Sequence, residues 1–171
     1  IQTLGGSGVV ELFNANRNGT SEAAARIRPT GGGTLTIGSG ITVRNATNSE
    51  LTTLGDATGG SLVIAGNVLA QSSGKTLRVT GTTVTNTGIY EATAGTLNLV
   101  GTTVINNGTW LANAGAIVVT GLSGNLGAAS ITNNGTLDLT GTYAINQPMP
   151  VGGSGVLTLR GTWQNNSAIT Q

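Results

Sequence analysis

Thr76-Leu77-Arg78-Val79-Thr80-Gly81-Thr82 is the stretch that decides the fold, because its pattern returns at a fixed interval of twenty residues. Four further copies begin at Thr96, Ala116, Thr136 and Val156. The second and fourth positions of every copy are Leu, Ile or Val, and the sixth is Gly. Five copies without an insertion predict a repeat architecture, in which each unit buries its apolar face against its neighbours.

Each twenty-residue unit divides into three short strands. In the first strand, Leu77 and Val79 alternate with Arg78, which predicts apolar residues on one face and a varied solvated column on the other. The glycine that follows predicts a corner, because glycine readily adopts positive φ. A second strand ends on Asn in most units, with Leu126 as the exception, and a third includes residues such as Ile89-Tyr90-Glu91-Ala92.

Stacking each residue on the one twenty positions later predicts an all-β fold, a parallel β-helix with a coil of about 20 residues and rungs about 4.8 Å apart. An antiparallel meander would pair successive hairpins in mirror order and would not require every column to repeat. The absence of a hexapeptide period favours a right-handed coil. The Asn columns predict ladders of side-chain amides between rungs.

The chain divides into residues 1–30, predicted as an irregular N-terminal rung or cap, and residues 31–171, predicted as β-helix repeats. The alternative for residues 1–30 as a whole is an ordinary surface loop. Within this part, Val9–Phe13 is a predicted strand, and Ser21–Ile27 is predicted as one or two helical turns.

The repeat pattern begins in looser form after residue 30. We align Gly33–Gly38 and Gly60–Gly66 with the copies that start at Thr76, and the residues between them, Asn45–Thr58, are a candidate loop. Insertions of this kind fit a solenoid, because they lie in the loops between strands.

Composition excludes several classes of function. Charged residues make up 8% of the chain, the net charge is +1, and the charges are scattered, which argues against a nucleic-acid partner. No apolar run approaches the length of a membrane-spanning segment. Cys and His are absent, which excludes disulfides and Cys/His zinc sites. The acidic Gly-rich stretch Gly55–Gly60 occurs once, unlike the repeated calcium-binding signature, so we predict no metal and no cofactor.

Five Asn-X-Ser/Thr sequences match the glycosylation acceptor pattern. Asn-Gly-Thr sequences recur at the predicted turns of the repeat, so we interpret these Asn residues as turn residues. The five Asn residues of these sequences are Asn18, Asn45, Asn107, Asn134 and Asn165.

A first residue of Ile rather than Met indicates a processed product or a fragment.

The pattern Gly-Thr-Leu-X-Leu-X-Gly-Thr followed by Asn-Asn-Gly-Thr, as in Gly95–Thr109 and Gly135–Thr142, resembles the repeats of bacterial secreted β-helix proteins. It resembles especially the repeats of autotransporter passengers and filamentous-haemagglutinin-like adhesins, and the resemblance covers about residues 31–166. It implies an exported bacterial protein, secreted or on the cell surface, without an active-site residue to carry over.

Catalytic groups are scarce in the regular repeats. Glycoside hydrolysis needs two carboxylates that face each other across a bond. The acids there are Glu91 and Asp138, which occupy different columns more than two rungs apart. We therefore predict that the protein is not an enzyme.

The aromatic residues are the candidate binding groups. Tyr90 and Trp110 are twenty residues apart, as are Tyr143 and Trp163, so each pair should stack on adjacent rungs. Exposed pairs would form platforms for sugar rings or another protein, and buried pairs would be internal ladders that stiffen the sheet. Any specific activity is expected at these aromatics or where the columns break, near Leu122–Leu126.

The predicted function is a non-catalytic structural or adhesive module whose partners are glycans or a host or neighbouring cell surface. An alternative is a filament subunit that stacks head to tail, since Gly161–Gln171 shows no obvious cap. Two lesser alternatives are a polysaccharide-active β-helix enzyme and an ice-binding solenoid. The latter rests on the column formed by Thr82, Thr102, Thr142 and Thr162, which Leu122 interrupts.

Overall fold

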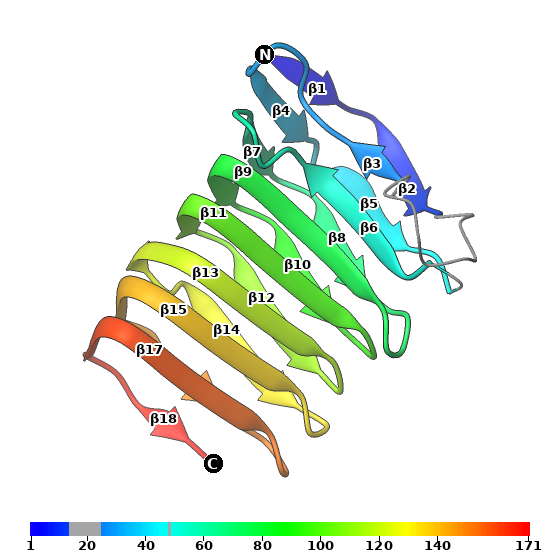
Figure 1. Cartoon of the computed structure of the whole chain (residues 1–171). Helices are drawn as coiled ribbons and strands as arrows, with labels where there is room; N and C mark the ends of the chain where they lie inside the picture. The colour runs from blue at the N-terminus through cyan, green and yellow to red at the C-terminus, as the bar shows by residue number, and fades with distance from the viewer. Residues whose placement is uncertain (14–24, 48) are drawn as a thin grey trace.

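The computed structural model describes residues 1–13, 25–47 and 49–171, and in these ranges the chain forms β-strands and turns without a helix (Figure 1). Every described strand pair is parallel, and the coils stack along one axis. The fold is therefore a parallel β-helix, as the repeat predicted. No helix that could cross a membrane occurs in the ranges just given.

Three columns of strands form the walls of the coil. The first column contains β3 (Arg26–Ile27), β6 (Leu51–Gly55) and the first halves of β9 (Thr76–Asn86), β11 (Thr96–Asn106), β13 (Ala116–Asn125), β15 (Thr136–Ile145) and β17 (Val156–Asn165). The second column contains β1 (Gln2–Leu4), β4 (Thr34–Ile37), β7 (Ser61–Ile64) and the second halves of the same long strands.

The third column closes the coil. It contains β2 (Ser7–Leu12), β5 (Gly40–Asn45), β8 (Asn67–Ala70), β10 (Ile89–Ala92), β12 (Thr109–Asn113), β14 (Ala128–Thr132), β16 (Met149–Pro150) and β18 (Ile169–Thr170). A bridge between Ile131 and Val151 joins β14 to the coil of β16. Each long strand bends sharply partway along its length, where the first wall passes into the second (Figure 1).

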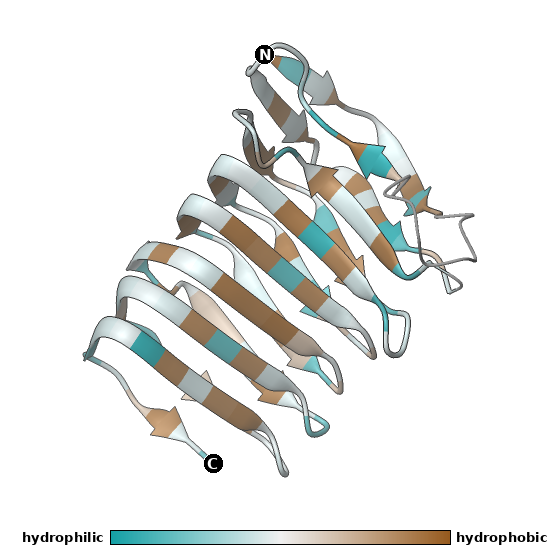
Figure 2. Cartoon of the chain, viewed as in Figure 1, coloured by the Kyte–Doolittle hydropathy of each residue, from teal (hydrophilic) through white to brown (hydrophobic). Residues whose placement is uncertain are grey.

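The core is made by the inward positions of the repeated phrase. Leu97 stacks in register on Leu77 and Leu99 on Val79, and all four side chains are fully buried. Figure 2 shows such residues as brown bands that recur on successive strands. The alternation of apolar and polar residues thus produces a continuous apolar column inside and a varied column outside.

A ladder of amides runs along the corner between the second and third walls. Asn86 Nδ2 donates to Asn106 Oδ1 at 2.7 Å, and Asn106 Nδ2 donates to the Leu126 carbonyl at 2.6 Å. Each of these buried Asn residues also accepts the backbone N–H of the glycine two positions later. The predicted amide ladder is confirmed here. Beyond Leu126 a second ladder continues on the surface, through Asn125, Asn146 and Asn166.

The early coils are arranged differently from the prediction. The predicted loop Asn45–Thr58 contains β6, which pairs with β9 so that Thr52 lies beside Leu77 and Leu54 beside Val79. Thr52 is buried at a position where the repeat has Leu, so the apolar pattern did not predict this strand. The alignment of β4 and β7 with the phrase at Thr76 is also wrong, because Leu62 of β7 stacks on Val84 in the second wall.

The N-terminal segment contributes strands to the coil. The predicted strand Val9–Phe13 is confirmed as β2, whose Val10 pairs with Val43 of β5. The predicted helical turn is wrong at Arg26–Ile27, which form β3. The rest of that turn, up to residue 24, and Asn18 lie outside the described residues.

Candidate functional site

Tyr90 and Trp110 pair in register on β10 and β12, with ring centroids 5.2 Å apart and an angle of 40° between the planes. Both side chains have 0% of their surface exposed. Of the two alternatives for this pair, the structure shows the internal ladder and not the exposed platform, because Tyr90 and Trp110 take the inward positions of their strands. Burial raises the pKa of the Tyr90 phenol far above its ordinary value.

At the break in the columns near Leu122–Leu126, Leu122 and Leu126 belong to the core, whereas Ser123, Gly124 and Asn125 between them are exposed. Leu122 and Leu126 are each 1% exposed, and the Leu126 carbonyl accepts a hydrogen bond from Trp110 Nε1 at 2.8 Å. Ala129 is the register partner of Trp110 on the next rung, so a small side chain follows the large Trp110 ring in this inward column. The Leu126 end of the break therefore contacts Trp110, while Ser123–Asn125 lie at the surface.

Tyr143 and Trp163 form the second register pair, on β15 and β17. Tyr143 is 4% exposed and takes an inward position, whereas Trp163 in the same column is 43% exposed. Trp163 is more exposed because β17 pairs with β15 on one edge and, within the described residues, with no strand on the other. Of the four candidate aromatics, Trp163 alone presents much of its ring to solvent.

The two candidate acids lie on different walls of the coil. Glu91 is on β10 in the third wall, and Asp138 is on β15 in the first wall, where Arg160 holds it in a bidentate pair with distances of 3.1 and 3.2 Å. They do not face each other as a carboxylate pair would. The described residues also bring together no group of three His, Cys, Asp or Glu side chains that could hold a metal ion.

The threonine column is exposed but interrupted. Thr82, Thr102, Thr142 and Thr162 are all exposed. Ser123 is the register partner of Thr142, and Leu122 is buried, so the row does not continue across β13.

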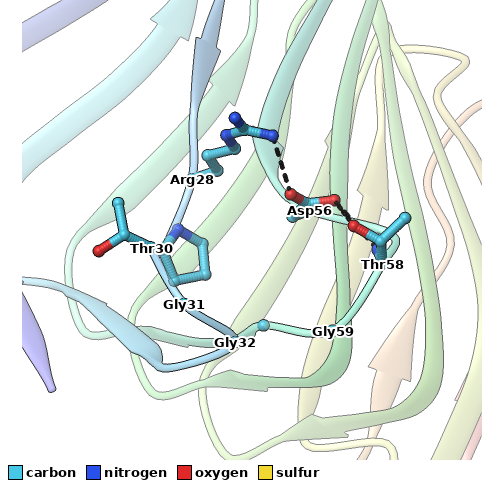
Figure 3. A pocket seen from close by; sticks show the side chains of 9 residues that line it. Arg28, Thr30, Gly31, Gly32, Asp56, Thr58 and Gly59 are labelled. Carbon is cyan, nitrogen blue, oxygen red and sulfur yellow. Dashed lines mark hydrogen bonds and ion pairs between the residues drawn. The ribbon is translucent and has the colours of Figure 1, made fainter.

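A hollow of about 390 Å³ opens at the corner between the first and second walls in the coils of β3–β5 and β6–β8 (Figure 3). Later coils turn this corner within one strand, but here residues 28–33 separate β3 from β4 and residues 56–60 separate β6 from β7. The two loops lie on adjacent rungs. The hollow is lined by Arg28, Pro29, Thr30, Gly31, Gly32, Asp56, Thr58, Gly59 and Gly60.

Asp56 is the centre of the polar contacts in this hollow. Its Oδ1 accepts the Thr58 hydroxyl at 2.7 Å and the Thr58 N–H at 3.0 Å, and its Oδ2 lies 3.2 Å from Arg28 Nη1 (Figure 3). The hydrogen bonds from Thr58, with a smaller contribution from Arg28, lower the pKa of the Asp56 carboxyl. The hollow therefore holds an ionised acceptor beside an exposed guanidinium and hydroxyl groups.

In the sequence, Gly55–Gly60 suggests no more than a weak calcium motif, and Arg28 lies in the segment predicted to be irregular. The signal that marks the hollow is the departure of two adjacent coils from the twenty-residue period. A charged residue stands at the same corner in each of them.

A second hollow of about 480 Å³ lies at the corner between the second and third walls. Its polar lining is rich in side-chain amides and lacks charge. The amides are those of Asn106, Asn107, Asn125 and Gln147.

Comparison of the chain with protein-family models, with curated proteins and with solved structures finds no match.

We predict that Trp110→Ala lowers the free energy of unfolding by about 3–5 kcal/mol, because it leaves a large cavity in the core. Trp163→Ala should cost at most about half as much, since its ring is already partly in solvent. Urea denaturation followed by circular dichroism measures both. Equal losses for the two variants would contradict this placement of the rings.

We also predict that the Asp56 carboxyl titrates below the ordinary value of 3.8. Because its folded pKa is lowered, Asp56 favours the folded state above its unfolded pKa, and this contribution is lost as pH falls through the folded pKa. Thr58→Val and Arg28→Gln should each raise the Asp56 pKa, because each removes a group that favours the ionised carboxylate. NMR titration of the carboxyl carbon measures this, with the remote Thr87→Val as the control that leaves it unchanged.

Proposed function

We propose that this chain is a non-catalytic structural or adhesive module of an exported bacterial protein, secreted or held at the cell surface. The observation that carries the proposal is the uninterrupted stack of parallel coils around one apolar column. Such a stack forms a rod whose backbone hydrogen bonds run along its axis. The resemblance of its repeats to secreted β-helix adhesins agrees with this role.

The outward columns supply the surface for adhesion. In the first wall, Arg78, Asn98, Val118 and Asp138 occupy one outward column on four successive rungs. A rod with many such columns offers repeated weak contacts, and linked contacts of this kind raise the overall affinity. Glycans or a host or neighbouring cell surface are the partners that we propose.

A catalytic role has little support in the arrangement of charged groups. Asp138 is held by Arg160, and Glu91 lies on another wall of the coil. A polysaccharide-cleaving β-helix would need two such groups facing one substrate bond.

We predict that beads coated with the native protein attach to at least one glycan on an array, and that heat-unfolded protein attaches to none. We expect no release of reducing ends from the bound glycan. Release that disappears in Glu91→Ala or Asp138→Ala would overturn the non-catalytic proposal. Absence of attachment to every glycan and cell surface tested would remove adhesion and leave the structural role.

A second candidate function is head-to-tail assembly, and the lower burial of β17 favours it. Leu157, Leu159 and Trp163 continue the inward columns of β15, yet they are less buried than their partners. In a parallel sheet the free edge of one end complements the free edge of the other. A second copy that stacks its first coil on β17 would cover these side chains.

This candidate predicts a concentration-dependent increase in sedimentation coefficient for the native protein. Trp163→Glu should abolish the increase, because it places a charge in the contact between copies. Thr162→Glu adds the same charge at the neighbouring outward position and should leave assembly intact. A native protein that stays monomeric at all concentrations would exclude head-to-tail assembly.

A further inference from the structure

Two arginines share an outward column at the N-terminal end of the first wall. Arg26 of β3 pairs in register with Thr53 of β6, and Thr53 pairs with Arg78 of β9. Two rungs of a β-sheet separate the arginines, which places their Cα atoms about 10 Å apart. The next residue in the column, Asn98, is uncharged.

These two cations differ from the others in the part of the chain that the structure describes. There the remaining basic side chains each pair with an acid: Arg28 with Asp56, Arg44 with Glu11, Lys75 with Glu50 and Arg160 with Asp138. Within the same described ranges, no acid pairs with Arg26 or Arg78. Positive charge without an internal partner is therefore concentrated on this column.

The side chain of Arg78 is held close to the sheet. Its Nε is buried and has no hydrogen-bond partner among the described residues, while the residue as a whole is half-buried. Arg26 is exposed. An anion that approaches the column meets one guanidinium anchored against the wall and one that is free to adjust.

The column adjoins the hollow at the first corner. Arg28 follows Arg26 by two residues on the same rung, and Asp56 follows Thr53 by three residues on the next. The hollow adds an ionised carboxylate acceptor and the hydroxyl groups of Thr30 and Thr58. Guanidinium groups, which can bind carboxylates, thus lie beside a carboxylate and hydroxyl groups, which can form hydrogen bonds with neutral hydroxyls.

We propose that the Arg26–Arg78 column and the adjoining hollow bind a carboxylate-bearing polysaccharide. The guanidinium groups hold carboxylates of the glycan, because their planar forks match a carboxylate. Asp56 accepts hydroxyl groups of a sugar ring in the hollow. The inference rests on the proposed adhesive function and assigns a ligand class to it.

The same charges do not suit a nucleic acid. Binding to a phosphate backbone depends on many neutralising cations, and two unpaired arginines supply few of them. Asp56 would also repel phosphates that entered the hollow. A sugar polymer with hydroxyl groups between its carboxylates uses both signs of charge.

The test is binding of the native protein to alginate, a linear polymer of uronates, with neutral dextran as the comparison polymer, by biolayer interferometry at low salt. The native protein should bind alginate and not dextran, and rising salt should weaken binding. The double variant Arg26→Gln/Arg78→Gln should lose affinity about tenfold, because charged hydrogen bonds are removed. Arg26→Lys/Arg78→Lys should retain part of the affinity.

Arg44→Gln/Arg160→Gln is the matched control, because it removes the same charge from ion pairs elsewhere on the rod. The affinity of this control for alginate should stay within about twofold of native. The ion pairs that it removes are exposed and contribute little to stability, so the fold should be unchanged. Circular dichroism of all variants verifies that each is folded. An equal loss in the control would show a general charge effect and overturn the inference.

Two other outcomes also overturn it: undiminished alginate binding by Arg26→Gln/Arg78→Gln, and native protein that binds no alginate. If that native protein still attaches to another glycan or to a cell surface in the bead assay, the proposed adhesive function survives while this site fails. If it attaches to nothing, the site and the adhesive function fail together.

Discussion

The in-register parallel hydrogen bonding between one coil and the next is the constraint on which the structure depends. It brings the backbones of successive corners so close that a side chain does not fit between them. A Cβ on Gly88 would lie 1.9 Å from the Gly66 carbonyl oxygen, and one on Gly121 would lie 2.3 Å from that of Gly101. Gly121 also has φ of +87°. At these corners glycine is required by the approach of the neighbouring coil, and at Gly121 by backbone conformation as well.

The regular coils could be predicted from the sequence, because one residue type recurs in each column. The inward face can be identified from the sequence alone by the recurring Leu77, Leu97 and Leu137. The Asn86–Asn106 ladder follows from the same period. The early coils could not be predicted in this way. Their loops vary in length, and Thr52 takes a position that the pattern gives to Leu, so the periodic signal is lost although the strand pairing remains.

The candidate site was predictable only in part, for a different reason. In Ile89-Tyr90-Glu91-Ala92 both Ile89 and Tyr90 are apolar enough to point inward, so alternation alone did not decide the orientation of the ring. The structure turns Tyr90 inward, and Trp110 with it. The coil of β13 and β14, which stacks on the rung of Trp110, departs from the repeat. Leu126 replaces the Asn of the ladder, and its carbonyl takes hydrogen bonds from both Asn106 and Trp110.

Inward columns and corner loops differ in how far they determine the stability of this rod. Each inward side chain stacks on those of the adjacent rungs, so a substitution there changes the packing of neighbouring coils. Longer loops at the first corner leave the stack intact, because backbone hydrogen bonds such as Ser61 N–H to the Gly33 carbonyl, at 3.0 Å, keep the rungs in register across them. The Arg28–Asp56 hollow is built from such loops. A binding surface there can change its side chains without changing the core, which is the condition under which one scaffold serves many ligands.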